Sequence, residues 1–148
     1  MEAVIFIGMQ ASGKSTFYRE RYFSSHVRIS LDMLRTRHRE TRLLEVCLDT
    51  KQPFVVDNTN PTKSDRQIYI SSAKQAGFRV VGYYFQSSIE DCKRPNEQRA
   101  VEQQIPLPGL LGTFSKLELP RLDEGFDELF YVRITEDGFV VEEWRDEV

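Results

Sequence analysis

Short runs of apolar residues alternate along the chain with longer stretches that have helical periodicity. Five of the apolar runs are predicted to be strands, at residues 3–7, 27–30, 54–57, 80–85 and 129–134. Helices are predicted between or after them, at residues 15–22, from 31 through the forties, at 65–76 and from about 89 onward. Strands that alternate with helices favour a parallel sheet whose strands are joined by crossover helices.

The last apolar segment has a different role. Residues 139–144 follow a turn at Asp137-Gly138 and are predicted to form an antiparallel edge strand, and an irregular connection is expected at residues 105–109. The 148 residues contain neither a repeat nor a low-complexity linker. The chain is therefore predicted to form a single α/β domain over residues 1–148, with a mostly parallel central sheet of about five strands flanked by helices.

The segment after the first predicted strand has the pattern of a phosphate-binding loop, G-x-x-x-x-G-K-S-T, at residues 8–16. Its two glycines let consecutive backbone N–H groups turn inward around phosphates, Lys14 can reach the β- and γ-phosphates, and the Ser15 hydroxyl can ligate Mg²⁺. The following helix adds the positive end of its dipole. The sequence therefore predicts that the chain binds a nucleoside triphosphate. The binding residues are predicted to be Gly8, Gln10, Ala11, Ser12, Gly13, Lys14, Ser15 and Thr16.

A second polar group follows the second predicted strand. Asp32 and Arg35 are three positions apart, so on one helix they share a face. Open parallel sheets bind ligands at the carboxyl ends of their strands, which places this pair beside the phosphate loop. There Asp32 can accept a proton from a hydroxyl and Arg35 can hold a phosphate. The alternative is structural, because both residues also stabilise helices at this spacing.

A third polar group, Asp57-Asn58-Thr59-Asn60, stands at the end of the third predicted strand. Many phosphate-loop enzymes carry an acidic residue at the place of Asp57, where it orients Mg²⁺ or its waters. Such residues also form ordinary turns. The order along the chain is more informative, because a phosphate loop, an Asp-x-x-Arg group and this segment each follow a strand. That order indicates a kinase with a donor site and an acceptor site.

The charge is unevenly distributed. The formal net charge of −3 gives no overall attraction to nucleic acid, so such a partner requires a local basic surface. A candidate lies between residues 19 and 42, and a solvated surface explains such runs equally well. Its basic members are Arg19, Arg21, Arg28, Arg35, Arg37, Arg39 and Arg42. Only Glu20, Asp32 and Glu40 oppose them, whereas the chain from residue 117 onward is acidic.

The remaining composition excludes several classes. Cys47 and Cys92 are far apart and no paired histidines are present, so we expect neither a zinc site nor a disulfide, and we expect inert thiols. His26 and His38 are expected to be solvated or packed side chains. The amino terminus enters a strand without the pattern of a signal peptide, and no apolar stretch approaches a bilayer-spanning length. A cytoplasmic protein with no membrane partner is expected.

The ordered set of motifs resembles the kinase domain of the polynucleotide 5′-kinases, the end-healing enzymes of DNA and RNA repair. The resemblance spans nearly the whole chain and is carried by residues 8–16, 32–35, 56–61 and 118–134, the last around Glu124-Gly125-Phe126. It implies a P-loop kinase fold with a small lid, ATP and Mg²⁺ as cofactors, and phosphoryl transfer to a 5′-hydroxyl end of nucleic acid. Several relatives also carry a phosphatase with an Asp-x-Asp-x-Thr motif, which is absent here.

The resemblance also implies a role for each site residue. Lys14 is implied to be catalytic, with Mg²⁺ held by Ser15 and Asp57. Asp32 is implied to be the general base that activates the 5′-hydroxyl, and Arg35 to hold the adjacent phosphate.

Further residues are implied on the acceptor and lid sides. Asn58, Thr59 and Asn60 are implied to line the acceptor site. The family carries lid arginines over the donor phosphates, for which Arg99 is the nearest match and Arg94 the second candidate.

Two other functions are consistent with the same loop. One is a P-loop kinase that phosphorylates a small-molecule alcohol, and the other is an ATP-binding regulatory or toxin-like module. Only the polynucleotide kinase requires the surface from Arg28 to Arg42 to hold phosphates. A GTPase is excluded by the order of the motifs. The segment Thr62-Lys63-Ser64-Asp65 resembles a guanine-reading motif, but such a motif should follow an Asp-x-x-Gly switch and lie beyond a later strand, and this segment meets neither condition.

Overall fold

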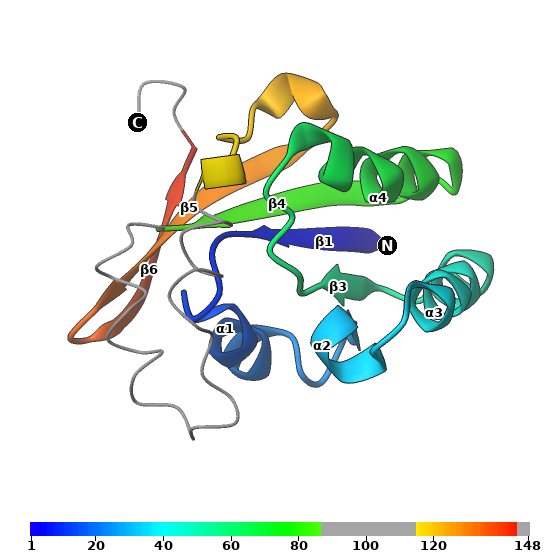
Figure 1. The fold of residues 1–148 in the computed structure, drawn as a ribbon, viewed down its shortest axis with the longest axis horizontal. Coiled ribbons are helices and arrows are strands. Elements are labelled where there is room, and N and C mark those ends of the chain that lie inside the picture. Colours follow the sequence, from blue (N-terminus) through cyan, green and yellow to red (C-terminus); the bar gives the residue numbers. More distant parts are fainter. Residues whose placement is uncertain (87–114, 145–148) are drawn as a thin grey trace.

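The computed structural model describes residues 1–86 and 115–144 (Figure 1). Six strands form one sheet in the order β2-β3-β1-β4-β5-β6. They are β1 (Glu2–Ile7), β2 (Val27–Ile29), β3 (Phe54–Val56), β4 (Arg79–Phe85), β5 (Glu128–Thr135) and β6 (Gly138–Glu143). The first five run parallel and β6 is antiparallel to β5. The predicted α/β class, the mostly parallel sheet and the antiparallel edge strand are confirmed.

The helices lie on both sides of this sheet, with α1 on one side and α4 on the other (Figure 1). They are α1 (Lys14–Arg21), α2 (Leu31–Leu34), α3 (Arg37–Thr50) and α4 (Lys63–Gln75), and a short 3₁₀ helix, η2, covers Leu122–Glu124. The helices predicted at 15–22 and 65–76 are confirmed to within two residues. The helix predicted from about 89 onward and the connection predicted at 105–109 lie outside the described residues.

The single helix predicted from residue 31 through the forties is wrong, because the chain breaks it into α2 and α3. Arg35 ends α2 with a φ of 77°, a backbone conformation that residues other than glycine rarely adopt. Thr36 then caps α3, since its hydroxyl accepts a hydrogen bond from the Arg39 backbone N–H at 3.1 Å. Asp32 therefore lies within α2 whereas Arg35 follows its last residue, so the two are not part of the one continuous helix that the spacing predicts.

The core has two layers because the strands are buried on both faces. Ala3, Ile5 and Ile7 of β1 pack in a cluster with residues of α3 and α4, whereas Val4 and Phe6 pack in a second cluster with residues of α1. Strands of a parallel sheet covered by helices on both faces have this near-continuous apolar character. The alternation of side chains along β1 therefore sets which helix covers which face.

The strand register brings three connections together at one edge of the sheet. Ile5 of β1 lies opposite Val56 of β3, and Val56 lies opposite Ile29 of β2. All three strands run in the same direction, so the chain leaves each of them at the same edge. The phosphate loop, α2 and the segment from Asp57 onward start there, as the sequence predicts.

A buried ion pair ties this edge to the chain after residue 115. Arg66 of α4 is fully buried, and its guanidinium donates to the two carboxylate oxygens of Glu124 at 2.9 and 3.1 Å. A third nitrogen donates to the backbone oxygens of Asn60 and Glu118 at 3.0 and 3.2 Å. One side chain therefore holds three separate segments of the chain, and a forked pair of this kind is geometrically specific.

Replacing Glu124 by Ala should destabilise the domain by about 3–5 kcal/mol, because it leaves the buried Arg66 charge without its partner. Unfolding by urea, followed by circular dichroism, measures the change. Asp123→Ala is the matched control, since this neighbouring carboxylate is exposed and contacts only the exposed Arg121 at 3.3 Å among the interactions described. Equal losses in the two variants would contradict a structural role for the Arg66–Glu124 pair.

Candidate active site

The lysine of the phosphate loop lies inside the curve of the loop. Lys14 is 7% exposed, and its ammonium donates to the backbone oxygens of Gly8 and Met9 at 3.0 and 2.5 Å and to the Ser12 hydroxyl at 3.3 Å. These contacts hold the ammonium where backbone N–H groups of such a loop surround a phosphate. The arrangement is that of an anion site at the start of α1.

The residue before this lysine must be a glycine for two reasons. Gly13 has a φ of 94°, which glycine adopts without the penalty that a side chain brings. A Cβ at this position would also lie 3.0 Å from the Ile134 side chain and 3.2 Å from that of Phe139. The hairpin of β5 and β6 therefore packs directly against the phosphate loop.

The two predicted magnesium ligands are in contact. The Ser15 hydroxyl donates to Oδ2 of Asp57 at 2.9 Å, and the Asp57 side chain is 2% exposed. Arg28 lies against both, because its Nε donates to the same Oδ2 at 2.9 Å and its Nη2 donates to the Ser15 oxygen at 3.0 Å. A hydroxyl, a carboxylate and a guanidinium thus converge at the mouth of the phosphate loop.

The donor set at this point fits Mg²⁺. The ion prefers oxygen ligands, and sites that also hold substrate phosphates use one or two protein carboxylates and several waters. Ser15 and Asp57 supply two oxygens within 2.9 Å of each other. Within residues 1–86 and 115–144, no group of three or more histidine, cysteine or acidic side chains forms an all-protein metal site.

A pocket of about 100 Å³ joins the phosphate loop to the two polar groups that follow β2 and β3. Ligand pockets are commonly about 300–1,000 Å³, so this one takes only part of a nucleotide. Its described lining residues are Gln10, Ala11, Gly13, Lys14, Ser15, Asp32, Asp57, Asn58 and Thr59. The predicted site residues in the described ranges that do not line it are Gly8, Ser12, Thr16, Arg35 and Asn60.

Asp32 and Arg35 are both exposed. Asp32 is in the first turn of α2 and lines the pocket, whereas Arg35 follows the last residue of that helix. No hydrogen bond or ion pair joins either side chain to another described residue. The two predicted lid arginines, Arg94 and Arg99, lie outside the described residues.

Asn58 is held by a buried network and does not point freely into the pocket. Its Oδ1 accepts a hydrogen bond from the backbone N–H of Leu31 at 2.9 Å, and its Nδ2 donates to Glu40 at 2.9 Å. Glu40 is 4% exposed and also accepts from Tyr69 at 2.7 Å and from Arg37 at 3.0 Å. Burial and the bond to Glu40 raise the pKa of Tyr69, so its hydroxyl remains a donor. This network fixes the start of α2, which carries Asp32.

Thr59 and Asn60 hold the phosphate loop against the sheet. The backbone oxygen of Thr59 accepts from the Gly8 N–H at 3.0 Å. The Asn60 side chain is buried and donates to the backbone oxygen of Phe6 at 2.8 Å, so it faces β1 rather than the pocket. In the sequence Asn60 could not be told apart from a ligand-binding residue, because both uses require the same polar side chain.

Several residues that shape this site belong to no recognisable motif in the sequence. Glu40, Arg66 and Tyr69 are the buried members of the polar networks, and Arg28 was considered only as part of a basic surface. One signal was available for Arg66, because it belongs to the same helical face as Tyr69 and Ala73, both of which are buried.

Two weaker sequence features also have structural explanations. Thr62 and Asp65 form a reciprocal cap at the start of α4, with hydrogen bonds of 3.1 and 3.3 Å, which accounts for the resemblance to a guanine-reading motif. Cys47 is buried, and burial raises the pKa of its thiol, as expected of an inert cysteine. Among the helices described, none has the length and apolar composition needed to cross a bilayer.

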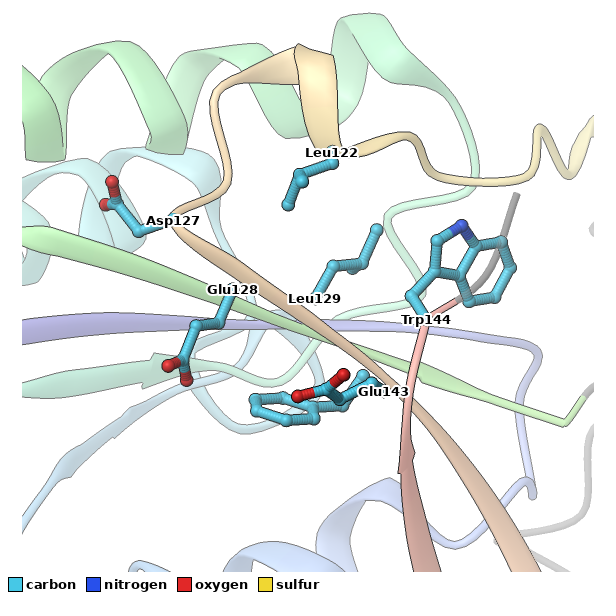
Figure 2. Close-up of a pocket in the computed structure, with 7 residues that line it drawn as sticks. Leu122, Asp127, Glu128, Leu129, Glu143 and Trp144 are labelled. Atoms are coloured by element: carbon cyan, nitrogen blue, oxygen red, sulfur yellow. The ribbon is translucent and has the colours of Figure 1, made fainter.

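A larger pocket of about 270 Å³ lies at the other end of β5, where that strand begins and β6 ends. Figure 2 shows Leu122 and Leu129 between the carboxylates of Asp127 and Glu128 on one side and the indole of Trp144 on the other. The phosphate loop follows the opposite, carboxyl end of the parallel strands. This pocket therefore has none of the phosphate-loop chemistry.

The fold and the loop define a class of protein, the P-loop kinase fold. Two solved structures share it: Kti12 from Chaetomium thermophilum in complex with ADP-AlF3, and a gluconokinase from Sinorhizobium meliloti. Each is 18% identical to this chain and covers 91% of it, with TM-scores of 0.68 and 0.62. The match spans 92% of the Kti12 chain and 83% of the gluconokinase chain. The same architecture is therefore found in both Kti12 and a gluconokinase.

Sequence comparisons show similarities to particular protein families. Residues 38–110 match a family model described as an AAA domain. Over 129 residues the chain is also 28% identical to the bifunctional polynucleotide phosphatase/kinase of Schizosaccharomyces pombe. The matched region is 84% of this chain and 32% of that protein. The chain spans about a third of the length of the curated relatives it matches. The chain is therefore similar in sequence to about a third of a bifunctional polynucleotide phosphatase/kinase.

Replacing Glu40 by Ala should destabilise the domain, because Tyr69 and the Asn58 amide lose a buried acceptor, at about 1–3 kcal/mol for each unpaired group. Glu45→Ala on the same helix is the control: its carboxylate is half exposed and lies 3.6 Å from an exposed Arg42, so a change below about 0.5 kcal/mol is expected. Urea unfolding measures both. A Glu40 variant as stable as the control would show that the network is dispensable.

Proposed function

We propose that this domain transfers the γ-phosphate of ATP to a 5′-hydroxyl end of DNA or RNA. The observation that carries the proposal is the pocket in which Lys14 and Ser15 of the phosphate loop and Asp32 of α2 line one space. A donor phosphate and an acceptor hydroxyl can meet there, which is what an in-line displacement requires.

The donor side is the phosphate loop. Its backbone N–H groups and Lys14 bind the β- and γ-phosphates, and Ser15 and Asp57 hold Mg²⁺. When bound, the ion neutralises charge on the phosphate oxygens. A lid arginine, for which Arg99 and Arg94 are the candidates, adds a second positive charge for the transferred group.

The acceptor side begins at Asp32. As general base, its carboxylate accepts the proton of the attacking hydroxyl while the oxygen of that hydroxyl forms a bond to the γ-phosphorus and the bond to the β–γ bridging oxygen breaks. Asn58 contributes indirectly, because its bonds to Leu31 and Glu40 fix the helix on which Asp32 lies. Positioning of this kind lowers the barrier by removing the need to orient the reactants.

Two observations favour a nucleic-acid end as the acceptor. The first is the similarity to the kinase-containing relative over 84% of this chain. The second is Arg35, which is exposed, lies three residues from Asp32 and has a φ of 77°. Strained backbone conformations are concentrated at functional sites, and this guanidinium can bind the phosphate next to a terminal nucleotide.

The basic stretch extends that surface. Of its seven arginines, all but Arg28 are exposed. Arg42 lies 3.6 Å from Glu45 of α3 and both side chains are exposed, so this pair contributes little and leaves the guanidinium available to other anions. Binding to an oligonucleotide should therefore weaken as the salt concentration rises.

Replacing Asp32 by Ala should lower the rate of transfer by about 2–4 orders of magnitude, because the general base is lost, while ATP affinity stays nearly unchanged. Single-turnover transfer and ATP titration measure the two effects. Asp49→Ala is the control, since Asp49 is an exposed acid of α3 outside the pocket. Transfer by Asp32→Ala at the wild-type rate would refute the role of Asp32.

The acceptor is identified by incubating the protein with γ-labelled ATP, Mg²⁺ and one acceptor at a time: 5′-hydroxyl DNA, 5′-hydroxyl RNA, or a panel of sugars that includes gluconate. Label is expected on an oligonucleotide, with lower efficiency at high salt. Label on a sugar alone would instead show a small-molecule kinase. ATP binding with no labelled acceptor would favour a regulatory nucleotide-binding module.

A further inference from the structure

We propose that Arg28 occupies the magnesium position when no nucleotide is bound and that Mg²⁺ must displace it, so that Arg28 sets the metal concentration at which nucleotide binds. This inference rests on the proposed function for the identity of the metal and the nucleotide. In this inference Arg28 competes with the metal ion, whereas the exposed arginines in the same stretch are expected to contact phosphates.

The contacts of Arg28 coincide with those that the ion requires. Oδ2 of Asp57 accepts from Nε of Arg28 at 2.9 Å and from the Ser15 hydroxyl at 2.9 Å. The Ser15 oxygen in turn accepts from Nη2 of Arg28 at 3.0 Å. The guanidinium therefore uses lone pairs on both predicted metal ligands. A Mg²⁺ ion on the same two oxygens would therefore compete with the guanidinium for them.

Strand alternation explains how an arginine reaches this point. Ile29 of β2 is buried in the cluster that contains residues of α3 and α4, and Val27 packs against the same cluster. Arg28 lies between them, so it faces the other side of the sheet, where α1 begins with the phosphate loop. It is paired in register with Val55 of β3, two residues before Asp57.

The pairing also compensates the charge of the buried Asp57 carboxylate. The Asp57 side chain is 2% exposed, whereas that of Arg28 is 28% exposed. A buried carboxylate without a partner is strongly destabilising, so a cation is needed at Asp57 whether or not a metal ion is present. Arg28 meets this need from a position that remains open to solvent, which allows it to leave when the doubly charged ion arrives.

The test compares wild type with Arg28→Gln, and uses Arg79→Gln as the matched control. Arg79 of β4 pairs with Glu128 of the neighbouring strand β5, as Arg28 pairs across β2 and β3, but both partners are about half exposed and lie at the opposite end of the sheet. Two quantities are measured without any acceptor: the melting temperature in EDTA, and the Mg²⁺ concentration that gives half-maximal binding of ADP in calorimetric titrations.

Arg28→Gln should melt at a lower temperature than wild type in EDTA, because Asp57 loses its cation. It should also reach half-maximal ADP binding at an Mg²⁺ concentration about tenfold lower, because the charge-assisted bonds no longer compete with the ion. Arg79→Gln should keep the wild-type Mg²⁺ dependence. Arg28→Lys keeps the charge but not the fork and should fall between wild type and Arg28→Gln, so it provides the same comparison if the glutamine variant does not fold.

An unchanged or higher Mg²⁺ requirement in the Arg28 variants would overturn the inference. Wild-type protein that binds ADP with Mg²⁺ would at the same time leave the proposed nucleotide site intact, so the two failures can be told apart. Wild-type protein that binds no ADP at any Mg²⁺ concentration would overturn the donor site itself and the displacement with it.

Discussion

The parallel pairing of β3 with both β1 and β2 is the constraint on which the site depends. Because Ile5, Val56 and Ile29 lie in register, the three connections that follow these strands leave the sheet side by side. Residues as far apart as Ser15 and Asp57 thereby come within hydrogen-bonding distance. The apolar contacts that fix the register also keep Asp57 nearly inaccessible to water, which makes its charge expensive unless a cation pairs with it.

Buried polar networks then hold the residues around the site in a defined arrangement. Glu40 accepts hydrogen bonds from Asn58, Tyr69 and Arg37. Asn58 in turn accepts one from the backbone N–H of Leu31, the first residue of α2. Arg66 joins α4 to Asn60 and Glu124. Each network connects segments that are distant in the chain, and every buried side-chain nitrogen or oxygen described in it has a hydrogen-bond partner, so each favours one geometry over its alternatives.

The proposed metal-binding role and the structural roles of polar residues alternate along a single segment. Asp57 faces the predicted metal position, Asn58 holds α2, Thr59 accepts a bond from the phosphate loop, and Asn60 holds the end of β1. Such a segment can be located from its composition and its position after a strand. The division of labour within it follows from the direction of each side chain, which depends on the surrounding packing.

The sequence by itself determined the sheet, the phosphate loop and the order in which the polar groups follow their strands. These features rest on local signals, namely apolar alternation, helix periodicity and glycines at fixed positions. Only the tertiary structure decided that the helix after β2 breaks at Arg35, that Glu40 and Arg66 are buried, and that Arg28 lies on the predicted metal ligands. The physical reason is that an arginine has the same local preferences whether its partner is water or a carboxylate 29 or 58 positions away along the chain, and only the folded chain supplies that partner.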